Sequence, residues 1–330
     1  SLYFHYTKKY FFVNTKNEKI FLLTSLFKSS IFKGNKKYAE PDIRRGIVMS
    51  VSIRLKIKTM YNDFSPKEQA IADYMLENPG IISHSSISDL ANELGIADST
   101  LFQFTKKLGY NGFKDFKLNL LMQENDFSAI SIHENIETND TELTMAHKVF
   151  DSNMTTLTDT KKLLQQEDLI LAADLIDQSK RLFFFGVGGS EIVATDTYHK
   201  FLRSPITVIH SSDYHIQLME ASLMTPEDCA IIISHTGKSK ETIRMAEVAK
   251  EAGAKIIVIT SQASSPLAKL GDVVFLSVSE ETEFRSEALA SRISQLSIMD
   301  SLYVILMFRH REESNQSISK VRQAISSSKQ

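Results

Sequence analysis

The chain has few of the residues that cross-link a protein or bind metals. Its 330 residues include a single cysteine, Cys229, which lies inside an apolar run. One cysteine excludes a disulfide framework, and no cysteine–histidine pair has the spacing of a structural zinc site. We therefore interpret Cys229 as a small buried hydrophobic residue and not as a nucleophile. We expect no metal site and no cofactor.

Long apolar runs and a strong charge of one sign are also missing. The longest apolar stretches, such as residues 302–308, are much shorter than the roughly 20 residues that a membrane helix needs. The net charge of −2 argues neither for nor against nucleic-acid binding, because a larger acidic domain can mask a small basic one. We expect a cytoplasmic protein with no membrane partner and with two domains, each large enough to bury its own core.

Residues 1–48 differ in composition from the rest of the chain. They contain no initiator methionine, are rich in phenylalanine, tyrosine, lysine and asparagine, and show no clear period. They also lack the ordered apolar core and cleavage site of a signal peptide. This atypical extension could be a basic-aromatic arm that touches nucleic acid, a packed extra element, or sequence upstream of the natural start. We favour the third interpretation, because Met49 opens a segment with an ordinary folded pattern.

Residues 49–124 have the pattern of a small helical domain. Ser65, Pro66 and Glu68 are typical of a helix start, and the Asn-Pro-Gly sequence at 78–80 is typical of a helix end. Apolar residues follow Ser65 at helical spacing. This segment therefore predicts the first helix of the domain.

Two further short helices are expected beyond that point. Ser88 is expected to cap one of them and the Asp98–Ser99 pair the other, with Gly95 in the turn between them. Two helices joined by such a turn are typical of a helix-turn-helix, whose last helix can enter a DNA major groove. On spacing alone, the alternative is a three-helix bundle with a solvated lysine face.

Several side chains of this segment suit a DNA surface. Short hydroxyls can contact phosphates or base edges, glutamine can read adenine, and lysines can neutralise phosphates. The candidate DNA-binding residues are Ser88, Asp98, Ser99, Thr100, Gln103, Lys106, Lys107, Lys114 and Lys117. We expect Arg54, Lys56 and Lys58 to add a basic approach segment.

The end of this segment gives a more specific signal. Residues 109–117 read Gly-Tyr-Asn-Gly-Phe-Lys-Asp-Phe-Lys, and residues 88–91 read Ser-Asp-Leu-Ala. With Ser99, Thr100 and Phe104, these residues resemble the N-terminal helix-turn-helix of the RpiR (MurR/RpiR) family of bacterial transcriptional regulators. The resemblance covers residues 65–117. The chain departs from the family at Gln103, where family members usually carry an arginine in the recognition helix.

The second half of the chain predicts a different architecture. Residues 125–166 are polar with weak helical periodicity, and we interpret them as a linker followed by a connecting helix. From 167 to 312, helical patterns alternate with apolar strands, expected at 181–185, 206–209, 229–233, 256–259 and 273–276. This alternation predicts a doubly wound parallel sheet with helices on both faces, a flavodoxin-like three-layer α/β/α fold. The fold class is therefore α plus α/β, with residues 313–330 as a C-terminal tail.

Two of the expected strands end in loops suited to an anion. One strand is followed by Gly188 and Ser190, and the other by Ser234, Thr236 and Ser239. Ligands of such sheets bind at the carboxyl ends of the strands, where loop amides and helix N-termini also point. The pattern is neither a full dinucleotide fingerprint nor a P-loop. Each hydroxyl alone could be a cap or turn residue, but together they favour a phosphate site.

These loops carry a second resemblance. Residues 234–242, Ser-His-Thr-Gly-Lys-Ser-Lys-Glu-Thr, and the Gly-Val-Gly-Gly-Ser loop at 186–190 make residues 168–309 similar to a SIS (sugar isomerase) domain. SIS domains bind phosphosugars through such loops. The resemblance implies the ligand-binding residues Gly188, Ser190, Ser234, Thr236, Gly237, Ser239, Thr242 and Glu287.

A helix-turn-helix followed by a SIS domain is the architecture of the RpiR family. The resemblance implies a DNA-binding transcriptional regulator, not an enzyme, that controls carbohydrate-metabolism genes. Its partners would be operator DNA and a phosphosugar effector. We expect a homodimer or homotetramer, which would present two helix-turn-helix units to a palindromic operator.

The alternative function is a SIS-domain sugar-phosphate isomerase or etherase. Isomerisation needs a base, and Glu287 lies near where such enzymes place a catalytic glutamate. Its possible partners are His199, His210, His215 and His235. We favour a ligand contact, or a carboxylate that faces a helix dipole, for Glu287. A helix-turn-helix domain suits a sensor and has little use in a metabolic isomerase.

Overall fold

The computed structural model describes residues 14–15, 18–19, 52–122, 136–137, 139–278 and 289–327. The chain divides between Gly46 and Ile47 into two units. The described part of the first unit is a pair of short antiparallel strands, β1 (Asn14–Thr15) and β2 (Glu18–Lys19). The rest of the atypical extension at 1–48 lies outside the described residues.

A helical domain opens the second unit. Its elements are α2 (Ile53–Met60), the 3-10 helix η1 (Tyr61–Asp63), α3 (Pro66–Glu77), α4 (Pro79–His84), α5 (Ile87–Glu93), α6 (Asp98–Lys107) and α7 (Phe113–Met122). Ile71, Leu90, Leu101 and Phe116 are fully buried in one core, in which the rings of Phe64 and Phe104 lie 5.1 Å apart. The core fixes α6, the expected recognition helix, on its neighbours.

The helix starts are partly those expected. Ser65 caps α3 and forms a capping box with Glu68, as predicted. Ser88, by contrast, does not cap α5: the N-cap is Ser86, and Asp89 completes its capping box. The residue before α6 is Ala97, which makes no side-chain cap. The expectation was wrong because several serines precede the helix and only Ser86 has an acidic residue three positions later.

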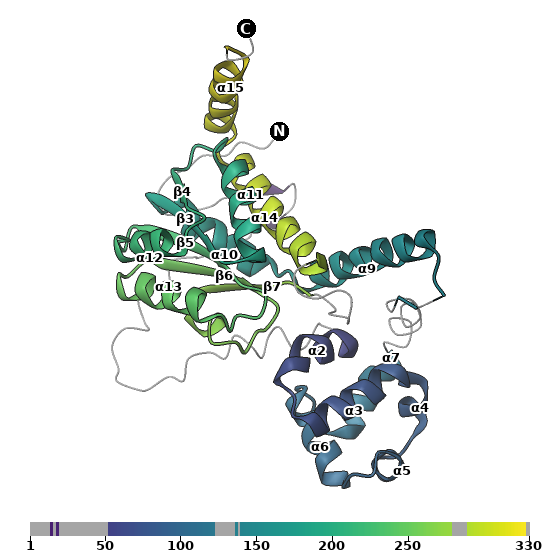
Figure 1. The fold of residues 1–330 in the computed structure, drawn as a ribbon. Helices are drawn as coiled ribbons and strands as arrows, with labels where there is room; N and C mark the ends of the chain where they lie inside the picture. Colours follow the sequence, from purple (N-terminus) through teal and green to yellow (C-terminus); the bar gives the residue numbers. More distant parts are fainter. Residues whose placement is uncertain are drawn as a thin grey trace, which may run out of the picture. The chain divides into compact units, whose positions relative to one another are not determined.

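A five-stranded parallel sheet forms the C-terminal domain (Figure 1). Its strands are β3 (Arg181–Gly186), β4 (Val208–His210), β5 (Asp228–Ile233), β6 (Lys255–Thr260) and β7 (Val273–Leu276). The order across the sheet is β4-β3-β5-β6-β7. This is the flavodoxin-like order, in which the first strand of the domain lies inside the sheet. The predicted fold class is therefore confirmed.

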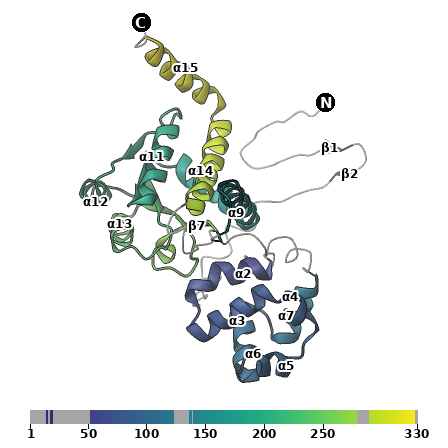
Figure 2. The ribbon, with the colours of Figure 1, turned by 45° about the vertical axis from the view of Figure 1, so that its right-hand side comes forward.

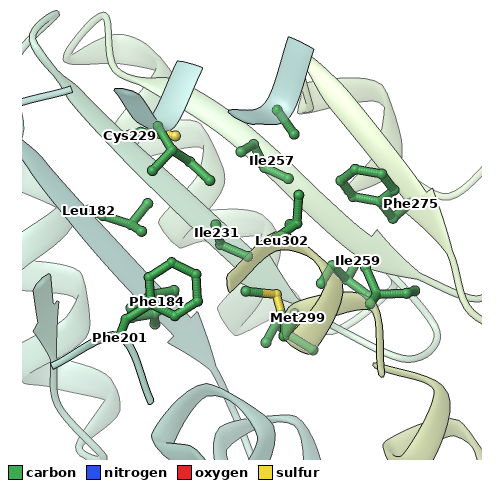
Figure 3. Packing of buried hydrophobic residues seen from close by; sticks show 14 of the residues in the cluster. Leu182, Phe184, Phe201, Cys229, Ile231, Ile257, Ile259, Phe275, Met299 and Leu302 are labelled. Carbon is green, nitrogen blue, oxygen red and sulfur yellow. The ribbon is translucent and has the colours of Figure 1, made fainter. Parts of the chain in front are cut away.

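Helices cover both faces of this sheet because its strands are apolar on both sides. Alternate residues such as Phe184 and Ile231 pack under α10 (Gln166–Asp177), α11 (Gly189–Phe201) and α14 (Leu289–Arg309) (Figure 3). Their neighbours Phe185 and Ile232 pack on the other face, under α12 (Tyr214–Ser222) and α13 (Lys240–Glu251). Such double burial is typical of parallel sheets.

The remaining elements are two helices and one turn of 3-10 helix. The connecting helix α9 (Glu142–Leu163) packs against α14, and η2 (Ala268–Leu270) follows β6. The residues expected as a C-terminal tail form most of a helix, α15 (Arg311–Ser327), which follows α14 at the end of the chain (Figure 2). Within the described ranges, no helix has the length and apolarity to cross a membrane.

Helix α2 does not provide the expected basic approach segment. Arg54 is buried and its Nη2 donates to Asp159 Oδ2 of α9 at 2.5 Å. Lys56 is also buried, with its Nζ 4.3 Å from the centre of the Tyr110 ring. Burial lowers the pKa of Lys56 to about 8 and that of Lys58 to about 7. Arg54 and Lys56 are therefore part of the packing of α2 and not of an exposed surface, and Lys58 is half-buried.

Candidate ligand-binding site and nucleic-acid interface

The two candidate anion loops begin side by side. Strands β3 and β5 are neighbours, and Gly186 at the end of β3 pairs with Ile233 at the end of β5. Loops 187–190 and 234–239 therefore leave the same edge of the sheet at adjacent positions. The sheet order reverses between these two strands, since β4 follows β3 on one side and β5 lies on the other. Ligands of open α/β sheets bind at such a switch point.

The first loop ends at the N-terminus of α11. Gly188 precedes the helix with a φ of 61°, a conformation that favours glycine. Ser190 is half-buried in the first helical turn, and its amide donates to Val187 O at 3.3 Å. The helix N-terminus carries a partial positive charge, which attracts anions. The loop thus brings a hydroxyl and a helix end to the same place.

The second loop combines a buried serine with a confined glycine. Ser234 is buried, and its amide donates to Ile259 O at 3.0 Å. Gly237 has a φ of 62°, and a Cβ placed on it would lie 2.2 Å from Ser265 Oγ. Thr236 is exposed, and its Oγ1 accepts from Lys238 N at 3.2 Å. The backbone of this loop is therefore tightly fixed.

The start of α13 completes this loop. Ser239 is the N-cap residue, but its hydroxyl does not cap the helix: it donates to Glu241 Oε2 at 2.6 Å. This bond lowers the pKa of the Glu241 carboxyl. Thr242 is buried and its Oγ1 donates to Ser239 O at 3.1 Å. Thr236 and Thr242 thus make local turn contacts, whereas the hydroxyls of Ser190 and Ser234 make no hydrogen bond within the described residues.

A third strand end, which the sequence analysis missed, supports the second loop. The carbonyl oxygen of His235 accepts three hydrogen bonds: from Ser261 N at 2.8 Å, Ser261 Oγ at 2.7 Å and Thr260 Oγ1 at 3.0 Å. Leu267 N donates to Gly237 O at 3.2 Å. The hydroxyl-rich sequence after β6, Thr-Ser-Gln-Ala-Ser-Ser at 260–265, was the available signal.

The four candidate histidines differ in position. His210 ends β4, with its side chain only 5% exposed; its Nδ1 lies 2.9 Å from Phe184 O and its Nε2 2.8 Å from Thr195 Oγ1. His215 is exposed in the first turn of α12, and His235 lies in the second loop. His199 lies near the C-terminal end of α11, away from the loops. Glu287, the candidate base, lies outside the described residues.

Part of the candidate DNA-binding surface is exposed on and next to α6. The turn at 94–97 separates α5 from α6, and Gly95 adopts a φ of 64° there, as a helix-turn-helix requires. The exposed candidates are Ser88, Asp98, Ser99, Gln103, Lys106, Lys107 and Lys114. Thr100 is half-buried, and Phe102 is 39% exposed on the same helix.

Several of these candidates, exposed ones included, have structural partners. Ser88 Oγ donates to Asp98 Oδ2 at 2.6 Å and so ties α5 to α6. Lys107 Nζ donates to Glu68 Oε2 at 2.8 Å, and Lys117 Nζ donates to Ser85 O at 3.0 Å. Lys106 and Gln103 are therefore better placed to contact DNA than Lys107 and Lys117.

Comparison with known families supports both halves of the chain. Residues 51–126 match the model of the helix-turn-helix domain of the rpiR family, and residues 175–305 match that of the SIS domain. An HTH-type transcriptional regulator of Thermotoga maritima is 34% identical over 255 residues, which cover 77% of this chain and 91% of that protein. The HTH-type transcriptional regulator HexR of Escherichia coli is 30% identical over 275 residues, which cover 83% of this chain and 94% of HexR.

Solved structures give the same picture. The fold is similar to that of the Vibrio vulnificus NanR protein complexed with ManNAc-6P, with a TM-score of 0.52 and 25% identity, over 82% of this chain and 97% of NanR. It is also similar to the sugar isomerase domain of an RpiR transcription factor from Sphaerobacter thermophilus, with a TM-score of 0.51 and 19% identity, over 54% of this chain and 98% of that one.

Proposed function

Because the chain belongs to the rpiR family of HTH-type transcriptional regulators, we propose that its SIS domain senses a phosphosugar and controls operator binding by its helix-turn-helix. The observation that carries this proposal is the adjacency of loops 187–190 and 234–239 at the switch point of the sheet. The similar NanR structure is a complex with ManNAc-6P, which supports a ligand of this class. The genes controlled would serve carbohydrate metabolism.

The phosphate would bind between the two loops. The hydroxyls of Ser190 and Ser234, the loop amides and the N-termini of α11 and α13 would hold its oxygens. Thr236 and Ser239 would add hydroxyls, while Gly188, Gly237 and Thr242 would shape the backbone. Glu287 would contact the sugar. The phosphosugar would favour one arrangement of a homodimer or homotetramer, and so change the spacing of two recognition helices on DNA.

Ligand binding is tested with a thermal-shift panel of sugar phosphates that includes N-acetylmannosamine 6-phosphate. We expect at least one of them to raise the melting temperature, because a ligand that binds only the folded state stabilises it. Ser234→Ala and Ser239→Ala should reduce that shift. Ser222→Ala is the matched control, since its hydroxyl bonds Met219 O at the far end of α12. Unchanged shifts in both loop variants would exclude this site.

DNA binding is tested by band shift on the region upstream of the protein's own gene. Lys106→Ala should weaken binding to all sequences and lower the salt dependence of log K by about one unit, because it removes one phosphate contact. Gln103→Ala should instead change the preferred sequence. Lys320→Ala, an exposed lysine on α15, is the control. If the chain binds no operator at low salt, with or without sugar phosphates, the proposal fails.

The isomerase alternative is tested with the same sugar phosphates. We propose that the chain is a sensor, so that NMR of long incubations should show no ketose–aldose interconversion. The relatives named as transcriptional regulators support this. Turnover at enzyme-like rates that Glu287→Gln abolishes would replace the sensor by an enzyme with Glu287 as its base.

A further inference from the structure

The end of strand β3 has a strand on only one of its sides. On the other side, β4 stops where His210 pairs with Phe184, whereas β3 continues to Gly186. Gly186 is buried, so the backbone groups that it directs beyond the end of β4 need partners other than water. These groups stand immediately before the 187–190 loop.

A side chain of α12 takes the place of the missing strand. Gln217 is fully buried; its Oε1 accepts from Gly186 N at 3.1 Å and its Nε2 donates to Gly186 O at 3.0 Å. The carboxamide thus reproduces both hydrogen bonds that a neighbouring strand would make with one residue. A helix residue thereby fixes the last position of the strand.

Gly186 in turn fixes the first turn of α11. A Cβ on Gly186 would lie 2.7 Å from Ser190 O and 3.0 Å from Glu191 N, so the glycine backbone lies in direct contact with that turn. A displacement of Gly186 would therefore displace Ser190. The contacts run without a break from Gln217 through Gly186 to Ser190.

We infer that Gln217 is a positioning residue for phosphosugar binding, which acts through Gly186 to hold Ser190 and the 187–190 loop. This inference rests on the proposed function. Gln217 itself touches no ligand in this mechanism. Its contribution is to hold the loop amides and the Ser190 hydroxyl in place before the ligand arrives, so that binding does not have to order them.

The substitution Gln217→Glu gives this role a chemical signature. A carboxylate has acceptors only and would face the Gly186 carbonyl without a hydrogen to donate. A neutral carboxylic acid has one O–H donor and a carbonyl acceptor, which is enough for the two hydrogen bonds that the amide makes with Gly186. Burial raises the pKa of such a carboxyl, so that its neutral form should persist in acid and be lost in alkali. Ligand affinity should follow this titration.

The experiment measures the dissociation constant of the tightest-binding sugar phosphate of the panel by calorimetry, with inorganic phosphate as a second probe. The dissociation constant of each probe is measured from about pH 6 to about pH 9. The value for each variant is divided by the wild-type value at the same pH, which removes the effect of the titration of the ligand. We expect Gln217→Glu to bind nearly as well as wild type in acid and about tenfold more weakly in alkali, as for one lost buried hydrogen bond.

Two further variants separate positioning from folding. Gln217→Met keeps the side-chain length without either hydrogen bond and should bind weakly at every pH. Ser204→Ala is the matched control: the buried Ser204 hydroxyl donates to Phe201 O at 2.6 Å and accepts from Ile206 N at 3.2 Å, before the start of β4. It should lose stability but keep wild-type affinity. Circular dichroism establishes that each variant is folded at the assay temperature.

The outcomes separate the two proposals. If wild type binds no sugar phosphate, the proposed function fails. If wild type binds, and both Gln217→Glu and Gln217→Met match its affinity at every pH, Gln217 does not position the loop, and the sensor function stands.

Discussion

The loop after β5 is held by the backbone and hydroxyls of the next strand end, whereas the loop after β3 is held by the side chain of a helix. Strand β6 continues as far as Thr260, beyond the position where Ile259 pairs with Ile233. It can therefore reach the His235 carbonyl. Strand β4 stops at His210, so the backbone of Gly186 is hydrogen-bonded by the side chain of Gln217 and not by a strand.

This difference follows from the position of each strand in the sheet. β5 lies between two strands that both reach its end, and β3 lies next to the short edge strand β4. A backbone support survives most substitutions, because every residue but proline has the same groups. A side-chain support depends on one residue. The loop after β3 should therefore be the more easily altered by a single substitution, except where a glycine is confined.

The largest effect is expected at Gly237, the confined glycine in the loop after β5. Gly237→Ala should destabilise the domain by about 1–2 kcal/mol for the left-handed backbone and by about 1–3 kcal/mol more for the clash with Ser265. Ligand binding should be lost with it. Urea denaturation and calorimetry measure the two quantities.

Gly95→Ala is the matched control for this substitution. Its φ of 64° is close to that of Gly237, but a Cβ there would meet no atom within 4 Å. It should show the backbone cost alone and leave sugar-phosphate affinity unchanged. Equal losses of stability in the two variants would mean that the contact with Ser265 does not confine the loop.

The second effect concerns a different side-chain contact with β3, which His210 makes at the end of β4. His210→Leu removes the Nδ1 contact with Phe184 O and the Nε2 contact with Thr195. The Phe184 carbonyl would be left without its side-chain partner, at a cost of about 1–3 kcal/mol in free energy of unfolding. His210→Asn, which can still donate a hydrogen bond, should lose less. If the two variants are equally stable in urea, this hydrogen bond does not support the strand.

A smaller effect is expected for the support of β5. Thr260→Val removes one of the three donors to the His235 carbonyl and should cost about 1 kcal/mol. Ser261→Ala should cost less, because the Ser261 amide keeps its bond. Sugar-phosphate affinity should fall by less than in Gln217→Met. The opposite order would mean that the loop after β5 depends on a single side chain as strongly as the loop after β3 does.

The smallest effect is expected at the other end of β5. Cys229 is fully buried near the start of the strand, and burial raises the pKa of its thiol. The thiol should therefore react with a disulfide reagent only on unfolding. Sugar phosphate should not change the rate at concentrations that leave the unfolding rate unchanged. If sugar phosphate changes the rate of the thiol reaction at concentrations that leave the unfolding rate unchanged, the whole of β5 responds to the ligand and not the loop alone.

The sequence predicted the elements that have a repeating or local pattern. It missed the contacts between residues that are far apart along the chain. Buried parallel strands read as apolar runs, so β5 and β7 were placed to within one residue. Hydroxyls at strand ends indicated the two loops. Gln217, however, reads as an ordinary polar helix residue, because its partner Gly186 lies 31 positions away.

The same limit explains the misassigned cations. Arg54 reads as a surface charge, and only the fold brings Asp159 to it, 105 positions along the chain. Lys56 likewise reads as a phosphate contact, but it packs over the Tyr110 ring. Spacing identifies local partners, as it did for Ser65 and Glu68. It does not identify partners across the fold.

Helix α2 has a consequence for engineering. Ile53 and Ile57 belong to the core of the helical domain, whereas Leu55 packs with Leu163 and Val278 of the C-terminal half. The helical domain therefore cannot be transferred alone to another sensor domain. In such a fusion Leu55 would be exposed and Arg54 would lack the Asp159 carboxylate. A working chimera would have to take the end of α9 along, or redesign one side of α2 for its new neighbour.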